Sequence, residues 1–117
     1  MITPPTSHTA NIEYTETALS CIKRIASFLT QVNVEPKPIL DAALKEFEAR
    51  VSTFPESCQI APQLLSIGCA KYRECNTKNG YRIIYSVSAT LDEITCHAIL
   101  RQKQDLQGLL FSRIIER

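Results

Sequence analysis

The stretch from Lys71 to Asp105 constrains the fold of this chain most, because it has the pattern of short β-strands joined by turns. Its run GYRIIYSV is expected to be a strand, whose successive side chains point to opposite faces of a sheet. The residues that share the first face are apolar or aromatic: Tyr81, Ile83, Tyr85 and Val87. Arg82 lies on the second face, and an arginine in mid-strand is costly inside an apolar core. The pattern therefore predicts that the Arg82 face is open to solvent or to a partner.

Three strands account for this stretch, and we predict them over residues 70–75, 81–87 and 93–100. Asn79-Gly80 is a strong turn signal between the first two strands, and residues 89–92 are expected to turn into the third. Strands joined by such short turns pair antiparallel. This half of the chain is therefore expected to form an antiparallel meander.

Two amphipathic helices are predicted before the strands. The first can be capped by Thr15 or Thr17, and its apolar residues recur at helical spacing: Ala18, Leu19, Ile22, Ile25, Ala26 and Leu29. The second follows prolines that suit the first turn of a helix, and it has a similar stripe: Leu40, Ala43, Leu44, Phe47 and Val51. It should end near Phe54-Pro55. Two helices joined by a short turn form an antiparallel hairpin.

The two ends of the chain have different compositions. Residues 1–10 contain two prolines and small polar residues, which predicts a disordered tail, and residues 11–14 are a candidate short strand. An apolar series over residues 106–115 predicts a closing helix, which Gly108 weakens by roughly 1 kcal/mol. The predicted fold is α+β: a short N-terminal strand, an antiparallel two-helix hairpin packed on a small antiparallel sheet, and a C-terminal helix, in one domain over residues 11–117.

Charge, cysteine content and hydropathy limit the kinds of partner, metal site and location that are expected for this chain. The formal net charge is +1, but acidic residues outnumber basic ones before residue 60 and the balance reverses after it, which hints at an anionic partner. The five cysteines have no paired spacing, and His8 lies far from His97, so we predict reduced thiols with no metal and no cofactor. No signal peptide and no apolar run of about 20 residues is present, which favours a cytoplasmic protein without a membrane span.

The order of these elements resembles that of a known protein family. Six segments support the resemblance: NIEYTETAL, FPES, LLSIG, YREC, GYRIIYSV and HAILRQKQDL. Over residues 11–107 the chain resembles the ParE/RelE superfamily of toxins from bacterial type II toxin–antitoxin operons. The resemblance implies a cytoplasmic, plasmid stabilisation-type toxin and a small antitoxin that wraps it in a hetero-oligomer. The expected antitoxin-binding surfaces are the helical hairpin and an apolar C-terminal set: Leu109, Leu110, Phe111 and Ile114.

One branch of the superfamily, the RelE-like toxins, consists of ribosome-dependent mRNA endonucleases. Cleavage of RNA by its 2′-oxygen needs a proton acceptor, positive charge on the phosphate and a donor to the leaving oxygen. The resemblance places Arg82 at the central arginine of such a site, Arg73 at a basic strand position and Lys103 as a third cation. The next alternate strand position is Cys75, and the region of the family's C-terminal tyrosine holds Phe111. The catalytic set is therefore incomplete.

The other branch, the ParE-like toxins, inhibits DNA gyrase, and the hairpin lengths and the ILRQKQDL ending favour it. The candidate target-binding residues, for gyrase or for the ribosome and mRNA, are all basic: Lys71, Arg73, Arg82, Arg101 and Lys103. A degenerate toxin that only binds its antitoxin is a third alternative.

Structural roles compete with these functional ones. Arg82 is equally expected to pair with Glu74 or Asp105 across the sheet, and His97 is expected to be packed or hydrogen-bonded rather than a general base. Cys75 is expected to be a small buried residue without an activating neighbour.

Overall fold

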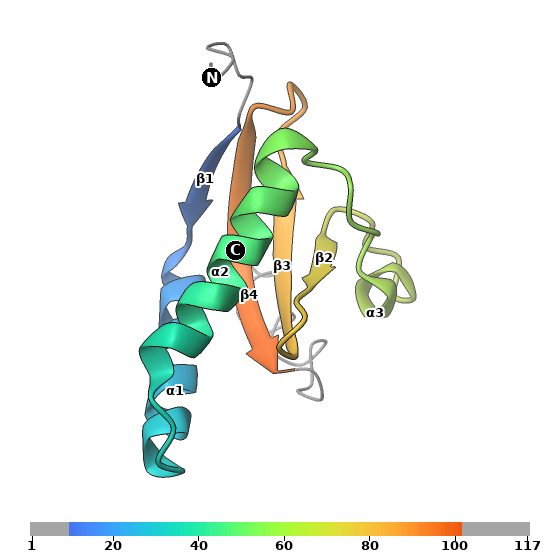
Figure 1. Ribbon diagram of the computed structural model, residues 1–117. Coiled ribbons are helices and arrows are strands. Elements are labelled where there is room, and N and C mark those ends of the chain that lie inside the picture. Colours follow the sequence, from blue (N-terminus) through green and yellow to red (C-terminus); the bar gives the residue numbers. More distant parts are fainter. Residues whose placement is uncertain (1–9, 102–117) are drawn as a thin grey trace, which may run out of the picture.

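The computed structural model describes residues 10–101, in which two long helices pack against a four-stranded sheet (Figure 1). The elements follow one another in this order: β1 Asn11–Tyr14, α1 Glu16–Gln31, α2 Pro36–Thr53, α3 Pro62–Leu65, β2 Arg73–Asn76, β3 Tyr81–Val87 and β4 Glu93–Arg101. The α+β class is confirmed. The predicted tail lies outside the described residues except for Ala10, which is buried and donates its N–H to Ser52 O at 3.0 Å. The predicted C-terminal helix also lies outside them.

The sheet has the strand order β1-β4-β3-β2. The three later strands form the predicted antiparallel meander, with β3 paired to β2 on one side and to β4 on the other. β1 adds in parallel to the free side of β4, with Asn11 opposite Glu93 and Tyr14 opposite Cys96. The sheet is therefore mixed, a pairing that the sequence analysis did not predict. Parallel neighbours need a long connection, and the whole segment between β1 and β4 supplies it.

Both long helices begin where their local signals predict. Thr15 caps α1, because its Oγ1 accepts a hydrogen bond from Ala18 N at 3.1 Å. α2 begins at Pro36, whose fixed φ and missing N–H suit a first helical turn, and it ends before Phe54. The short helix α3 lies between α2 and β2, where the sequence analysis named no helix.

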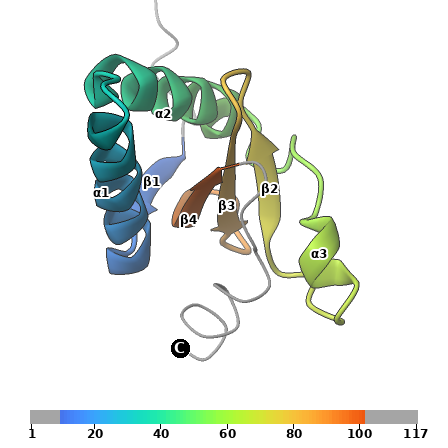
Figure 2. The same cartoon turned by 90° about the horizontal axis from the view of Figure 1, so that it is seen from below.

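The core lies between the sheet and the helices, and α2 crosses one sheet face (Figure 2). Phe47 of α2 packs its ring on that of Tyr85 of β3, with the ring centroids 5.5 Å apart and the rings edge to face. Such a pair contributes about 0.5–1.5 kcal/mol beyond the area it buries. Tyr85 is fully buried, so the aromatic face of β3 lies under the helices as predicted.

A register shift separates the two halves of β4. Ile84 pairs with Ala98 but Tyr85 pairs with Cys96, so His97 is an extra residue without a partner on β3. An extra residue of this kind interrupts the alternation of faces along its strand. Simple alternation would put His97, Ile99 and Arg101 on one face, but the bulge separates them. Arg101 pairs with Tyr81 on the helical face, whereas His97 contacts Ser86 on the opposite face.

Candidate functional site

Arg82 is the central residue of the predicted site, and its side chain is only 11% exposed. Nη1 donates to Gln63 Oε1 of α3 at 3.0 Å and lies 4.0 Å from Glu74 Oε1 on the neighbouring strand β2. Glu74 is itself 7% exposed. The expected open face is therefore not found at Arg82, and the alternative that it pairs with Glu74 is confirmed.

Arg82 shares its sheet face with apolar residues that are also buried. Ile84 and its partner Ala98, together with Leu100 opposite Arg82, are fully buried. A guanidinium is tolerated there because Glu74 offers it a carboxylate and Gln63 an amide oxygen. Breaking one partner of a buried ion pair typically costs about 3–5 kcal/mol, so loss of either residue alone should destabilise the fold.

Arg73, the second candidate, lies on the other face of the sheet. It is directly opposite Tyr85 in the β2–β3 register, and directly opposite residues share a face. Its Nη1 donates to Cys58 O at 2.7 Å and to Glu56 O at 3.3 Å, and its Nη2 lies 3.8 Å from the Glu56 carboxylate. Arg73 therefore fastens the segment after α2 to the start of β2. The neighbouring Lys71 is exposed, with its ammonium 5.5 Å from the centroid of the Tyr72 ring.

Arg101 ends β4 opposite Tyr81, so it lies beside Arg82 in the ladder but on the other sheet face. Its guanidinium carbon lies 4.2 Å from the centroid of the Phe28 ring on α1, a cation–π contact. Together with four more residues these two line a small depression of about 50 Å³ between α1 and β4: Cys21, Arg24, Ile25 and Ile99. Two cationic groups thus flank an apolar hollow.

His97 is held by its neighbours, as predicted. Its Nε2 lies 2.7 Å from Ser86 Oγ, and its ring meets the edge of the Tyr72 ring at a centroid distance of 5.0 Å. Ser86 lies on the face of β3 opposite to Tyr85, so the bulge directs His97 away from the helices. Both hydrogen-bonding and ring contacts give His97 a packing role.

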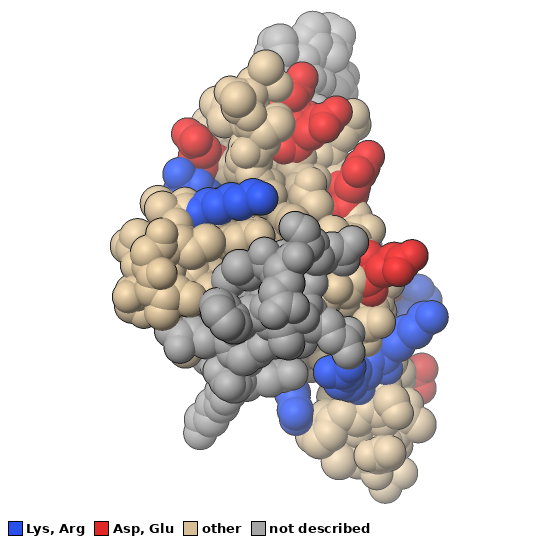
Figure 3. Space-filling view, turned by 180° about the vertical axis from the view of Figure 1, so that it is seen from behind, with Lys and Arg blue, Asp and Glu red and all other residues tan. Residues whose placement is uncertain are grey.

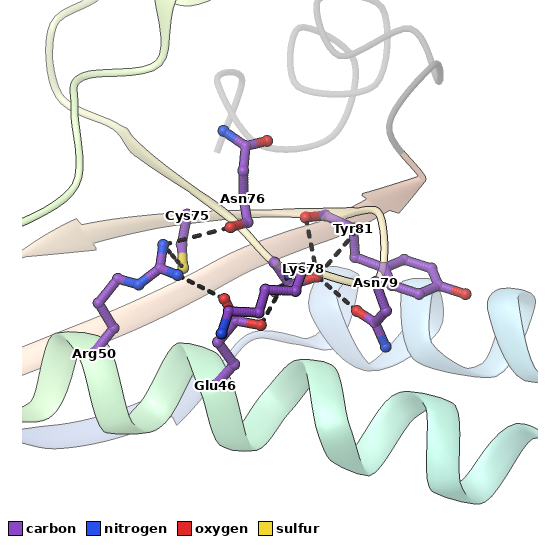
Figure 4. A network of polar contacts seen from close by, with 8 residues as sticks. Glu46, Arg50, Cys75, Asn76, Lys78, Asn79 and Tyr81 are labelled. Carbon is purple, nitrogen blue, oxygen red and sulfur yellow. Dashed lines mark hydrogen bonds and ion pairs between the residues drawn. The ribbon is translucent and has the colours of Figure 1, made fainter.

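A polar network that the sequence analysis missed joins α2 to the β2–β3 hairpin (Figure 4). Glu46 and Arg50, one helical turn apart on α2, form an ion pair. Glu46 Oε1 accepts from Lys78 N at 2.9 Å, and Arg50 Nη1 donates to Asn76 O and to Cys75 Sγ, each at 3.4 Å. The spacing of Glu46 and Arg50 is a visible i, i+4 signal, but its hairpin partners follow only from the tertiary fold.

Two thiols lie beside this network. Cys75 is fully buried, as predicted, and it lies beside Cys58 and Arg50. The pKa of Cys58 is lowered to about 5, chiefly by a hydrogen bond with the Cys75 thiol, against the opposing effect of burial. The same contact and burial raise the pKa of Cys75. The pair therefore favours a thiolate at Cys58 and a thiol at Cys75.

A family model described as the ParE toxin of the type II toxin–antitoxin system parDE matches residues 12–106. The chain belongs to the ParE toxin family. It is accordingly the toxin component of a type II toxin–antitoxin module. No protein with a curated description matches this ParE-family toxin.

Solved structures share the fold of this ParE-family toxin. The chromosomal ParDE toxin–antitoxin system from P. aeruginosa superposes with a TM-score of 0.59 at 17% identity, over 81% of this chain and 98% of that chain. The toxin–antitoxin complex RelBE2 from Mycobacterium tuberculosis gives 0.58 at 15% identity, over 81% and 94%. A doubly arginine-substituted mutant of the E. coli toxin RelE in the free state gives 0.57 at 15% identity, over 93% and 97%. At such identities the likeness establishes the fold alone.

The predicted cations of this ParE-family toxin do not converge among residues 10–101. Arg82 lies within one sheet face, Arg73 points to the other, and Arg101 lies against α1. Figure 3 shows the Lys and Arg side chains of its view in separate groups rather than in one patch. Lys103 and the predicted antitoxin-binding residues Leu109, Leu110, Phe111 and Ile114 lie outside the described residues. Over the described part, no helix is long and apolar enough to span a membrane.

Proposed function

We propose that this ParE-family toxin inhibits DNA gyrase and that a cognate antitoxin neutralises it in the cytoplasm. The observation that carries the choice of target is the placement of Arg73 and Arg82 on opposite faces of the sheet. Catalysis of RNA cleavage requires its cations and its base to be held around one phosphate. Two side chains that point away from each other, each occupied by contacts within the protein, do not meet that requirement. The match to the ParE family supports the same choice.

The alternative is a ribosome-dependent mRNA endonuclease. For that activity Arg82 would have to leave the buried carboxylate of Glu74 and act with Lys103. That rearrangement would leave the Glu74 carboxylate buried without its cation, and this energetic cost argues against the alternative. A degenerate toxin that only binds its antitoxin is the remaining possibility, and it predicts no effect on either target.

The test is a pair of reactions with the purified full chain. In the first, gyrase and ATP act on relaxed plasmid. In the second, a cell-free system translates a defined mRNA whose ends are mapped. We expect loss of supercoiling or gyrase-dependent linear DNA in the first reaction, and continued translation with intact mRNA in the second. Unchanged supercoiling at toxin excess would overturn the gyrase proposal. New mRNA ends at ribosome-occupied codons would establish the alternative.

The same question can be put to living bacteria. Induction of the chain, with growth, nucleoid morphology and labelled protein synthesis followed together, should give filamentation and DNA damage while translation continues. An immediate arrest of protein synthesis is the contrary outcome. Stable inheritance of a plasmid that carries the module, lost when the toxin gene is deleted, would support a role in plasmid stabilisation.

For the antitoxin we propose docking on the end of α1. Phe28, Val32 and Val34 are exposed there although they are large and apolar. They lie at the C-terminal end of α1 and in the turn that follows, and Phe28 also lines the depression that Arg24 and Arg101 flank. An amphipathic peptide segment with apolar side chains for the hollow and carboxylates for the two arginines is the complementary partner. Such docking gives the toxin–antitoxin hetero-oligomer that we expect, and the C-terminal set from Leu109 to Ile114 stays a predicted second contact.

A further inference from the structure

The segment before α3 runs antiparallel to the outer edge of β2. One bridge and two backbone hydrogen bonds define this pairing: Ile60 opposite Arg73, Ala61 N to Tyr72 O at 2.9 Å, and Glu74 N to Gln59 O at 3.0 Å. Residues 58–61 thus act as a short extension of the sheet beyond β2, and their register fixes which side chains meet.

This register sets Cys58 directly opposite Cys75. Cys58 lies two residues before Ile60 and Cys75 two residues after Arg73, so the antiparallel register that pairs Ile60 with Arg73 also pairs the two cysteines. The two hydrogen bonds lie on either side of the Ile60–Arg73 bridge and do not join Ile60 to Arg73, so this bridge is a non-hydrogen-bonded pair. Hydrogen-bonded and non-hydrogen-bonded pairs alternate along an antiparallel ladder. The two cysteines, two positions further along, therefore also form a non-hydrogen-bonded pair. In such pairs the Cα atoms are about 4.5 Å apart and the side chains are closest. A disulfide needs a Cα separation of roughly 4.4–6.8 Å, which this register meets.

A cation completes the arrangement from the opposite side. Arg50 of α2 directs Nη1 to the Cys75 sulfur at 3.4 Å, on the face of β2 that the helix covers (Figure 4). Arg50 also hydrogen-bonds to Cys58, which helps to lower the pKa of that thiol. Positive charge beside a thiol favours the thiolate, the form that reacts with peroxides. Cys58 is 7% exposed and Cys75 is fully buried, so only a small oxidant reaches them. A cationic neighbour and a second thiol within reach are two features of a redox-sensing cysteine.

We propose that Cys58 and Cys75 form a peroxide-sensitive thiol pair that closes into an intramolecular disulfide. The Cys58 thiolate attacks one oxygen of hydrogen peroxide, the O–O bond breaks, and the departing hydroxide takes up a proton to leave as water. The Cys58 sulfenic acid is then attacked by the Cys75 sulfur, which loses its proton, and a second water leaves. Two thiols are oxidised by two electrons in total, and one peroxide is reduced to two waters.

The disulfide closes a loop from residue 58 to residue 75 that contains α3. Gln63 of α3 contacts Arg82, so oxidation would enclose the partner of this arginine in a covalently closed loop. A cross-link over a loop of this length should raise the melting temperature by an amount on the order of 10 °C. The proposal does not depend on the identity of the toxin's target.

The experiment treats the full chain, reduced and freed of reductant, with a few equivalents of hydrogen peroxide. We expect the intact mass to fall by the two hydrogens of one disulfide, free thiols to fall from five to three, and a non-reducing peptide map to join Cys58 to Cys75. Formation of a different disulfide first, or peroxide-treated protein with five free thiols, overturns the proposal.

Variants separate the roles of the two thiols. Cys75→Ser should accumulate a sulfenic acid that a dimedone-type reagent traps at Cys58, whereas Cys58→Ser should not react at Cys75. Cys96→Ser is the matched control, because Cys96 is equally buried and its pKa is raised mainly by burial; it should form the 58–75 link at the wild-type rate. Arg50→Gln should slow formation of the link about tenfold. An unchanged rate in Arg50→Gln overturns the role of the guanidinium, and the wild-type peptide map stands as a test even if a variant does not fold.

Discussion

Arg73 and Arg82 lie on adjacent strands of one hairpin, yet Arg73 shares its sheet face with Tyr85 and Arg82 shares the other face with Asn76. Each arginine is used inside the protein, Arg73 to hold a loop and Arg82 to neutralise a buried carboxylate. A substitution at either position therefore tests the fold before it tests contact with a target. Loss of toxicity in such a variant needs a stability measurement beside it.

Arg82→Ala should lower the free energy of unfolding by about 3–5 kcal/mol, because it leaves the Glu74 carboxylate buried without its cation. Urea denaturation followed by circular dichroism measures the change. The double variant Arg82→Met with Glu74→Gln removes both charges together and should recover most of the loss. A single Arg82→Ala variant as stable as the parent would show that the pair contributes nothing to folding.

Arg73→Ala should destabilise the protein by about 1–3 kcal/mol, because the carbonyl groups of Glu56 and Cys58 lose a charged donor. Lys71→Ala is the matched control: this exposed cation is two residues away, and its removal should change stability by less than about 0.5 kcal/mol. Thermal unfolding of the two variants side by side provides the comparison. Equal melting temperatures for the two would contradict the fastening role of Arg73.

Tyr85→Phe should change the alkaline stability of the protein. Burial raises the pKa of the Tyr85 phenol above its ordinary value of 10, with a smaller contribution from Cys58. The folded protein therefore keeps this proton at pH values where the unfolded chain has lost it, so stability is intact below pH 10 and falls as pH rises above it. In that range the free energy of unfolding should fall by about 1.4 kcal/mol per pH unit.

Urea midpoints at pH 8 and at pH 11 measure this dependence. At pH 8 the Tyr85→Phe variant should be less stable by about 1 kcal/mol, because the hydrogen bond to Pro55 O at 2.8 Å is lost. At pH 11 the difference should shrink or reverse. An identical pH dependence in the two proteins would count against the raised pKa.

Phe28→Ser should weaken binding of the cognate antitoxin by at least about thirtyfold, since truncating an aromatic anchor typically costs 2 kcal/mol or more. Phe54→Ser is the matched control, because Phe54 is 68% exposed against 39% for Phe28 and lies after α2, away from the α1 depression. Titration calorimetry with both variants gives the affinities. Equal weakening by both substitutions, or by neither, would remove the proposed docking surface.

The elements with local signals were predictable from the sequence. The strand Tyr81–Val87 was predicted to the residue, and Thr15 and Pro36 mark the helix starts as capping and proline rules require. The features that were missed depend on distant partners. The parallel pairing of β1, the extra residue His97 in β4 and the meeting of Cys58 with Cys75 all follow from register between segments. A single strand pattern contains no information about that register.

The candidate site was predicted less well than the fold, and Arg82 shows the reason. Its mid-strand position was correctly identified as unusual, but two different environments satisfy a mid-strand arginine: an open face or a buried counter-charge. The choice depended on Gln63 of α3, a four-residue helix with no periodicity of its own, and on Glu74 across the strand pair. Residue type thus indicated a special position, and only the tertiary arrangement gave its role.

The place of β4 in the sheet has a consequence for synthesis of the toxin. β4 is the last strand of the described chain, but it lies between β1 and β3 and also packs against α1. A nascent chain that has not yet extended through Arg101 therefore lacks the strand that joins its N-terminal elements to the hairpin. Pairing between such distant segments is slow to form. Prematurely terminated products should remain unfolded and open to proteases, so the cell meets a folded toxin only after translation has passed this strand.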